Sequence, residues 1–369
     1  MKALLRDIPP HRLPDLAVRL GHPAYRGRQI RDWLYRRDAL SWDRLHNVPA
    51  ALRRELARRL DISGLSPAAA ETSRDGTHKV LWTLRDGETV ESVVIPMPTH
   101  HTFCISSQVG CRMACRFCAT ARGGLVRNLS AGEIVEQVQR LAARERQDAA
   151  PGSPRPRGYN VVFMGMGEPL DNLDRVLAAV RTLTAPEGLG LSPRRITIST
   201  SGHAAGMQRL IAQPVPVGLT LSVNSTDPRR RRRLMPVPGR TPLPELLALA
   251  ARYAARHHRR VTIAYVLIAG VNDDPAEARR LADLVAGGPF KVNLIPMNRI
   301  DADWGPPDEA VVLAFQDELR RRGVDAFVRI SGGEDISAAC GQLRRRRAGM
   351  GTGNRIRGDR PGRSAPGPR

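Results

Sequence analysis

The hydrophobic pattern of this 369-residue chain begins with helical spacing. Apolar side chains recur every three or four positions in residues 29–37 and 49–60, and the stretch from Trp42 to Pro49 between them has the composition of a short loop. A chain of this length exceeds one small domain, so two folded units are expected. The spacing predicts helices up to about residue 70, in a small N-terminal domain over residues 1–75.

Strand-like alternation replaces the helical spacing from about residue 78. Residues 78–87 and 88–96 alternate apolar and polar positions, and Asp86-Gly87 between them is a turn signal, so a β-hairpin is expected. Further along, short β-branched runs alternate with stretches of helical spacing. The runs expected as strands are 101–107, 160–165, 194–200, 217–223, 260–268, 290–296 and 324–330, and the expected helices begin near Ser130, Leu173, Leu243, Pro275 and Asp308.

This alternation of strands and helices decides the fold class. Repeated strand-helix-strand order implies right-handed crossovers and a parallel sheet. We predict an α/β protein with a partial (β/α)6 barrel of the TIM type over residues 76–343, whose site lies at the end where the strands stop. The first long helix has its own start signal, because Ser130 and Glu133 stand at capping-box spacing. Residues 150–158 are rich in Pro and Gly and are expected to form a loop.

The net charge of +22, from 58 Lys and Arg against 36 Asp and Glu, favours a polyanionic partner such as nucleic acid. The excess is uneven. Residues 344–369 contain nine arginines and one aspartate, and Arg229–Arg233 is an unbroken run of five. The tail over 344–369 has no apolar periodicity, so we expect it to be disordered. The alternative is an arginine-rich composition with solvated helix faces, which leaves charge alone as weak support for RNA.

Leader and membrane segments and the number of cysteines bear on the cellular compartment of the protein. The sequence has no secretory leader pattern and no uninterrupted run of 18 apolar residues, which favours a cytoplasmic protein without a membrane segment. Five cysteines in so long a chain do not make a disulfide scaffold. Three of them, Cys111-x3-Cys115-x2-Cys118, directly follow the strand expected at 101–107. In a reducing compartment such a group indicates metal or redox chemistry.

The spacing of these three cysteines favours one kind of metal centre. Three thiolates can hold three corners of a [4Fe-4S] cluster, and no fourth cysteine lies in the same loop of the sequence. The open iron can then be chelated by the amino and carboxylate groups of S-adenosylmethionine (SAM), whose reductive cleavage gives a carbon radical. The alternatives are buried structural cysteines or a zinc site completed by His100 or His101, although zinc sites usually pair C-x2-C units. The sequence therefore predicts a radical SAM enzyme.

Longer motifs then point to a family. In their sequence and order, the segments resemble the RlmN/Cfr family of radical SAM RNA methyltransferases, and the RlmN branch most. The resemblance covers about residues 20–343. The matching segments are 25–37, 104–120, 124–138, 161–172, 196–202, 234–237, 292–298 and 335–343.

The resemblance implies a binding site for SAM. Gly167 and Glu168, in the GMGEP motif, would hold the amino group of SAM. The residues that would contact its carboxylate and ribose are Ser199, Ser222, Val223, Asn224 and Asn298. Without the resemblance, the GMGEP motif is simply a turn at the end of a strand.

The resemblance also implies a reaction. One SAM would methylate Cys340, and a second would give a radical that takes a hydrogen atom from this methyl group, so that the resulting methylene radical adds to an adenine ring. Glu91 would accept the ring proton, and Cys104 would attack the Cys340 sulfur to release methylated RNA and form a disulfide. Without the resemblance, both cysteines are ordinary core residues and Glu91 is an exposed strand glutamate.

The implied substrate is adenine C2 in 23S rRNA, with tRNA as a second substrate and flavodoxin or ferredoxin as electron donor to a monomeric enzyme. The alternatives are Cfr-like methylation at adenine C8, a family paralogue with another substrate, an RNA-binding protein without catalysis, and a radical SAM enzyme for a small molecule or peptide. Three departures from the family pattern bear on the substrate: Ser222-Val223-Asn224 in place of Ser-Leu-His, Gly332 in place of arginine, and an altered segment after Asn298.

Overall fold

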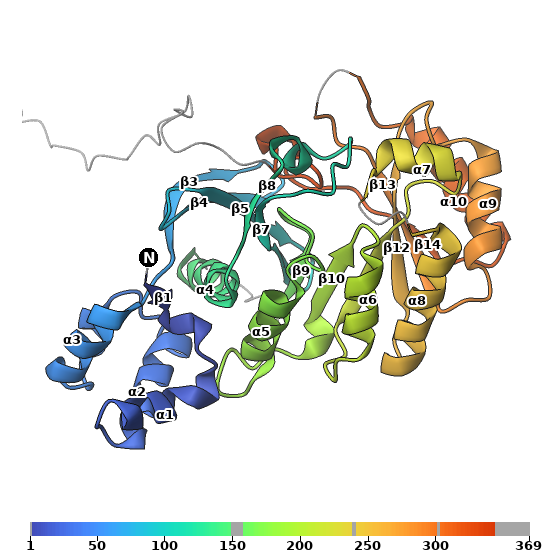
Figure 1. The fold of residues 1–369 in the computed structure, drawn as a ribbon. Coiled ribbons are helices and arrows are strands. Elements are labelled where there is room, and N and C mark those ends of the chain that lie inside the picture. The colour runs from blue at the N-terminus through green and yellow to red at the C-terminus, as the bar shows by residue number, and fades with distance from the viewer. Residues whose placement is uncertain (1, 149–157, 238–240, 301–302, 344–369) are drawn as a thin grey trace, which may run out of the picture.

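The computed structural model describes residues 2–148, 158–237, 241–300 and 303–343. Figure 1 shows a group of short helices at one end of the molecule and a long curved sheet, flanked by helices, in the remainder. The tail over 344–369 that is expected to be disordered, and nearly all of the Pro- and Gly-rich stretch 150–158, lie outside the described residues.

The N-terminal helices expected from the apolar spacing are confirmed. They are α1 (Leu13–Arg19), α2 (Ala24–Tyr35) and α3 (Ala50–Arg59), and the short strands β1 (Ala3–Leu4) and β2 (Leu60–Asp61) pair beside them. Helix α2 buries Ile30 and Leu34, and α3 buries Leu52 and Leu56. A spacing of four residues places each pair on one helix face, which packs inward.

The last part of the expected helical range is wrong. Residues 65–72 form strand β3 (Leu65–Thr72), which pairs antiparallel with β4 (His78–Leu84). The β3 sequence, LSPAAAET, has a single large apolar residue, so no strand periodicity is visible in it. Backbone pairing with β4, rather than an apolar face, sets its conformation. The domain boundary near residue 75 stays a prediction.

A ten-stranded sheet forms the body of the described structure. Its strands, in sheet order, are β14 (Ala326–Val328), β13 (Phe290–Pro296), β12 (Val261–Leu267), β11 (Gly218–Ser222), β10 (Ile196–Thr200), β9 (Tyr159–Phe163), β6 (His101–Cys104), β5 (Thr89–Pro96), β4 and β3. Neighbours from β6 to β14 are parallel, whereas those from β3 to β6 are antiparallel. The expected hairpin is β4 and β5, and Gly87 in its turn has φ +81°, which glycine adopts without strain.

Helices connect the parallel strands in the order expected of a (β/α)6 barrel. They are α4 (Ala131–Asp148), α5 (Leu173–Thr184), α6 (Ala204–Ile211), α8 (Leu243–His257), α9 (Pro275–Val285) and α10 (Glu309–Arg321). In the described part of the chain they make six crossovers, and β14 adds a seventh parallel strand, so the partial barrel is confirmed. The capping box is present at α4, where Ser130 N donates to Glu133 Oε2 at 2.8 Å and Glu133 N donates to Ser130 Oγ at 3.2 Å.

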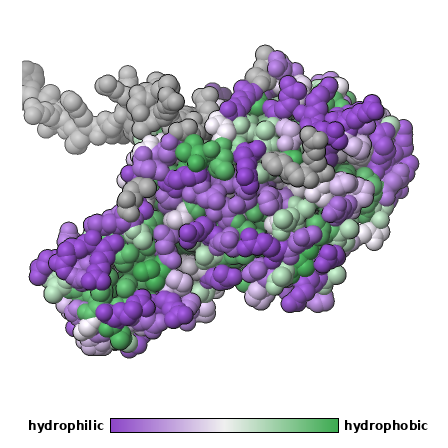
Figure 2. Space-filling model, viewed as in Figure 1, coloured by the Kyte–Doolittle hydropathy of each residue, from purple (hydrophilic) through white to green (hydrophobic). Residues whose placement is uncertain are grey.

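Two features near the strand ends were not expected from the sequence. The short helix α7 (Pro228–Leu234) contains the arginine run, and strands β7 (Gln108–Gly110) and β8 (Leu125–Asn128) form a separate hairpin on either side of the three close cysteines. Hydrophilic side chains cover most of the face shown in Figure 2, with smaller hydrophobic patches among them. Among the residues described, no helix combines the length and apolar character needed to cross a membrane.

Candidate active site

The residues expected to bind SAM follow the carboxyl ends of the parallel strands. Glu168 lies shortly after β9, Ser199 is near the end of β10, Ser222 ends β11, and Asn298 follows β13. Because parallel strands end at the same edge of a sheet, the fold brings these positions to one end of the barrel. Their role as SAM ligands stays a prediction.

The three close cysteines lie in the loop between β7 and β8. Cys111 N donates to Gly124 O at 2.9 Å, and Cys118 N donates to Cys115 O at 3.1 Å, which folds the loop into a tight turn. Cys111 is buried in a small apolar cluster that Leu234 of α7 also joins. The end of α7 therefore forms one wall of the cysteine loop.

The raised pKa values of these cysteines fit a site that is completed by a bound cation. Burial raises the pKa of Cys111 to about 12, and burial followed by the thiols of Cys118 and Cys111 holds the pKa of Cys115 well above its usual range. Thiols that shift each other's pKa share one small region, and a bound cation would stabilise their thiolates. As they stand, no three His, Cys, Asp or Glu side chains among the described residues are close enough to hold a metal ion.

The histidines of the zinc alternative are engaged elsewhere. His101 Nδ1 contacts the carboxylate of Glu145 on α4, and His100 Nδ1 lies 3.1 Å from Thr99 Oγ1. Neither histidine is therefore placed to complete a set with the three thiols, and three thiols without a histidine fit an iron-sulfur cluster with an open position better than a structural zinc site.

The GMGEP motif forms a turn that only glycine can make. Gly167 has φ +104°, and a Cβ there would lie 2.6 Å from Gln108 Cβ. Glu168 is buried: its N–H donates to Gln108 Oε1 at 2.8 Å, and its Oε2 accepts from Ser201 N and Oγ, each at 2.8 Å. Burial raises the pKa of Glu168, whereas the Ser201 bonds lower it. In this structure the carboxylate holds the turn against the end of β10.

The side chains of the segment Ser222-Val223-Asn224 are not all available to a ligand. The Val223 side chain is fully buried in the core, so only its backbone can reach a ligand. Asn224 has φ +61°, its Oδ1 accepts from Val266 N at 2.8 Å, and its Nδ2 lies 2.9 Å from Met235 Sδ. The amide that replaces the usual histidine is thus used inside the protein, and the half-buried Ser222 is the more accessible member.

Cys104 and Cys340 line the same small pocket. Its volume is about 80 Å³, and its other walls come from Ile95, Met97, Met164, residues 329–332, Ala338, Ala339 and Leu343. Cys104 is at the end of β6, and burial, followed by Cys340, raises its pKa to about 12. The fold therefore brings together two cysteines that are far apart in the sequence.

The segment that carries Cys340 is held against the cysteine loop. Ala119 N donates to Gly341 O at 2.7 Å, and Thr120 Oγ1 donates to Leu343 O at 2.6 Å. On the other side, Asn298 Nδ2 donates to Cys340 O at 3.0 Å. These bonds place Cys340 between the three close cysteines and the pocket of Cys104.

Glu91 lies in the interior of the sheet. It is 1% exposed on β5, which excludes the alternative of an exposed strand glutamate. Its backbone O accepts from Ser106 Oγ at 2.6 Å, and its Oε1 lies 3.7 Å from Lys79 Nζ. A buried carboxylate beside a cation is a suitable proton acceptor.

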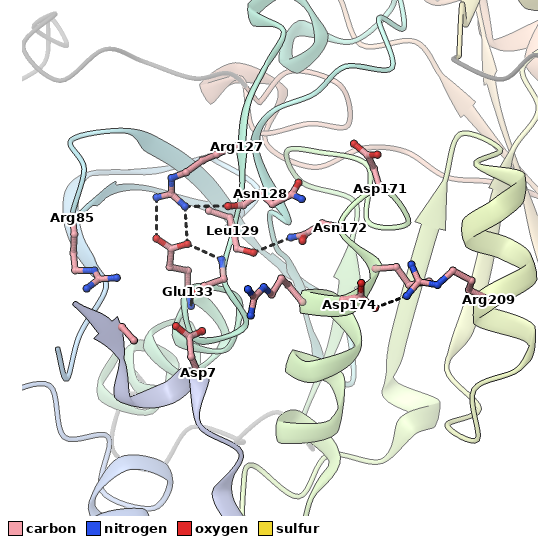
Figure 3. Close-up of a pocket in the computed structure, with 14 residues that line it drawn as sticks. Asp7, Arg85, Arg127, Asn128, Leu129, Glu133, Asp171, Asn172, Asp174 and Arg209 are labelled. Atoms are coloured by element: carbon pink, nitrogen blue, oxygen red, sulfur yellow. Dashed lines mark hydrogen bonds and ion pairs between the residues drawn. The ribbon is translucent and has the colours of Figure 1, made fainter. Parts of the chain in front are cut away.

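A larger cleft, of about 620 Å³, lies where the first residues of the chain, including Ala3 and Asp7, meet the barrel (Figure 3). Arg127 donates to both oxygens of Glu133 at 2.9 Å, and Arg209 pairs with Asp174. Asp7 Oδ1 accepts from Gly132 N at 2.7 Å across the junction. We interpret the cleft as a joint between the N-terminal segment and the barrel.

Comparison with known proteins identifies the family. Residues 105–282 match the radical SAM superfamily, and residues 4–62 match the ribosomal RNA large subunit methyltransferase N-terminal domain. Two proteins named dual-specificity RNA methyltransferase RlmN, from Desulfotalea psychrophila and an Anaeromyxobacter species, are 43% and 45% identical to this chain over 343 residues. These matches cover 92% of this chain and 94% and 90% of the two relatives. The chain belongs to the RlmN family of radical SAM RNA methyltransferases.

A solved structure agrees with membership of the RlmN family. The crystal structure of a radical SAM methyltransferase from Sphaerobacter thermophilus has a TM-score of 0.87 and 42% identity, and the match covers 92% of this chain and 99% of that one. Membership implies SAM as a co-substrate, an iron-sulfur cluster as a cofactor and RNA as the substrate.

Two cations near the site were not expected from the sequence, the buried Lys79 and the half-buried Arg231. Lys79 contacts Glu91, and Arg231 of α7 donates to Ser201 O at 3.2 Å while burial lowers its pKa. Arg231 lies three positions before the buried Leu234, a helical spacing that could have shown that the arginine run is not all solvated. Lys79 gave no such signal, because its contacts come from the neighbouring strands β3 and β5 and from residues 336–337.

Proposed function

We propose that this RlmN family member methylates carbon C2 of an adenine in 23S rRNA, and also acts on tRNA, through a methyl group carried by Cys340. The observation that carries the proposal is the common pocket of Cys340 and Cys104, beside an intact set of three close cysteines. The name of the two relatives, dual-specificity RNA methyltransferase, supports two RNA substrates. We also propose that the protein works as a monomer in the cytoplasm.

Cys111, Cys115 and Cys118 would hold one [4Fe-4S] cluster whose remaining iron is left to SAM. When bound, such a cluster would supply the reducing electron for cleavage of SAM and would accept the electron released by the RNA adduct. Two SAM molecules are consumed per methylation: one gives its methyl group to Cys340, and the other gives the radical. A flavodoxin or ferredoxin would supply reducing electrons.

The chain's own residues perform the remaining steps. After a hydrogen atom has left the methyl group on Cys340, its carbon bonds to C2 of adenine, and Glu91 takes the C2 proton. The Cys104 sulfur then bonds to the Cys340 sulfur. The electron pair of the broken carbon–sulfur bond stays with the carbon, which takes a proton and becomes the methyl group. The product disulfide is reduced before the next turnover.

The chemistry of adenine explains why a radical is needed. C2 has no lone pair, so it cannot displace the methyl group of SAM, whereas a carbon radical can add to it. The target base must also leave its stack to reach a pocket of about 80 Å³ between two cysteines. An RNA that is not yet fully folded meets this requirement.

The test is nucleoside mass spectrometry of large-subunit rRNA, and separately of tRNA, after anaerobic incubation with the reconstituted protein, SAM and a reductant. The expected product is 2-methyladenosine, and Cys340→Ala is the matched variant that should give none. Formation of 8-methyladenosine would select the Cfr-like reaction instead. Cleavage of SAM without either product would overturn RNA as the substrate.

A further inference from the structure

One face of the sheet carries the proposed reactive residues Glu91 and Cys104 together with the buried Lys79. Residues that pair directly across neighbouring strands share a face, and so do residues two apart on one strand. Glu71 pairs with Lys79, Lys79 with Val93, and Val93 with Cys104. Glu91, two positions from Val93, therefore lies on the same face as Lys79 and Cys104.

The ammonium of Lys79 is at the centre of this face. The residue is 3% exposed, and Nζ lies 3.0 Å from Glu71 Oε2 and 3.7 Å from Glu91 Oε1. Nζ also donates to the backbone O of Ile336, and it lies 3.4 Å from the backbone O of Ser337. A single cation thus touches two carboxylates and the segment that leads to Cys340.

The choice of lysine here stands out against the composition. Only three of the 58 basic residues are lysines, namely Lys2, Lys79 and Lys291. Acceptors on several sides of one point suit a compact ammonium with three rotatable donors, whereas the planar guanidinium of arginine suits acceptors in one plane. The chain uses arginine almost everywhere else, so the lysine at position 79 fits the contacts rather than the composition.

The same hairpin holds the neighbouring part of the segment. Asp75 Oδ2, in the turn between β3 and β4, accepts from Gly333 N at 2.9 Å. A Cβ on Gly332 would lie 2.4 Å from Thr77 Oγ1, so the segment approaches the turn more closely than a residue with a side chain allows. This contact explains how glycine, in place of the usual arginine, fits at position 332.

We propose that Lys79 is a positioning residue. Its buried ammonium contacts both the segment that leads to Cys340 and the carboxylate of Glu91, so that correct placement of this segment favours the charged form of Glu91. The inference rests on the proposed role of Glu91 as proton acceptor. When residues 336–337 are seated, the ammonium is fixed beside Glu91 and favours its carboxylate form. The base is thus in its accepting state when Cys340 is in place. The titratable groups that contact Lys79 or line the adjoining pocket in the described residues include Glu71, Cys104, Cys340 and Arg329.

The experiment compares five variants of the full-length, cluster-loaded protein with the wild type. They are Lys79→Met, Lys79→Arg, Glu91→Gln, the double variant that combines Lys79→Met with Glu91→Gln and, as matched control, Lys291→Met. Methylation of Cys340 is measured by intact-protein mass spectrometry without RNA. Release of methylated RNA, and covalent protein–RNA adduct on denaturing gels, are measured against pH. Thermal unfolding of each variant reports folding.

We expect Lys79→Met to retain methylation of Cys340, to accumulate the adduct, and to release RNA about tenfold more slowly near neutral pH, with recovery as the pH rises. Lys79→Arg should keep the charge and the wild-type pH profile at a lower rate, and Lys291→Met should behave as wild type. The double variant Lys79→Met with Glu91→Gln should be no worse than Glu91→Gln alone, because both act on one step.

A Lys79→Met protein whose release rate and pH profile equal those of Lys291→Met would overturn the inference. So would a folded variant that loses Cys340 methylation and release together, with no recovery at higher pH, because Lys79 would then be purely structural. Failure of the wild type to methylate RNA would instead overturn the proposed function, and the two failures are therefore distinguishable.

Discussion

Among the single residues of this site, Cys104 shows how the fold changes the readiness of a side chain to give up a proton. Burial, followed by Cys340, raises the pKa of Cys104 to about 12, whereas Arg329 acts in the opposite direction. Near neutral pH Cys104 is therefore a neutral thiol, and it must lose its proton when it attacks the Cys340 sulfur. Because the pocket is small and buried, this step is controlled by the protein rather than by solvent thiols.

We expect Cys104→Ala to leave the protein covalently joined to RNA, because the carbon–sulfur bond at Cys340 then has no attacking sulfur. Cys340→Ala, the matched control, should form neither adduct nor methylated RNA. Denaturing gels with labelled RNA distinguish the two variants. A Cys104→Ala protein that turns over without adduct would show that another thiol releases the product.

The sequence revealed some of these residues and could not have revealed others. The spacing of Cys111, Cys115 and Cys118 predicts a cluster by itself, because all three lie in one loop. Cys104 and Cys340 meet only in the folded chain, so they were found through the family resemblance. Lys79 was missed because its contacts with residues 336–337 depend on how the last segment crosses the hairpin.

Among the secondary-structure elements, the turn between β3 and β4 has the clearest function beyond the fold. It joins the antiparallel strands and also holds the segment over residues 332–337. Burial raises the pKa of Asp75, but hydrogen bonds from the backbone N–H groups of Thr77 and Gly333 outweigh this effect and lower it to about 2. The charged carboxylate is therefore the form that holds the turn and the segment together.

We expect Asp75→Asn to lower the free energy of unfolding by about 1 kcal/mol near neutral pH, a modest value because the carboxylate is exposed. Its pKa is lower in the folded than in the unfolded chain, so the contribution is fully present above about pH 4 and is lost as the pH falls towards 2. Urea unfolding at several pH values measures this. The exposed Asp43→Asn is the control, and an equal gap at every pH would contradict the assignment.

At the scale of the whole molecule, the order of strands and helices was predictable because each crossover helix buries an apolar stripe with a regular period. The starts of α5, α8 and α9 are at the predicted residues Leu173, Leu243 and Pro275. Strand β3 was not predictable, because pairing with β4 rather than its own pattern makes it a strand. The general rule is that local patterns indicate elements, whereas pairings between distant segments decide the edge of the sheet and the details of the site.

The arginine-rich residues after Leu343 follow the segment that carries Cys340 in the sequence. Leu343 is buried, and its backbone O accepts from Thr120 Oγ1, so the segment that carries Cys340 is anchored before the tail begins. A chain that ends at Leu343 should therefore still methylate Cys340 at the wild-type rate. It lacks nine arginines and one aspartate, so its affinity for RNA should fall, and its log affinity should depend less steeply on log salt, by about 0.7 for each lost contact with a single-stranded phosphate. RNA binding at several salt concentrations measures the slope. An unchanged slope would mean that the tail makes no contact with RNA, and that the folded part of the chain accounts for the attraction.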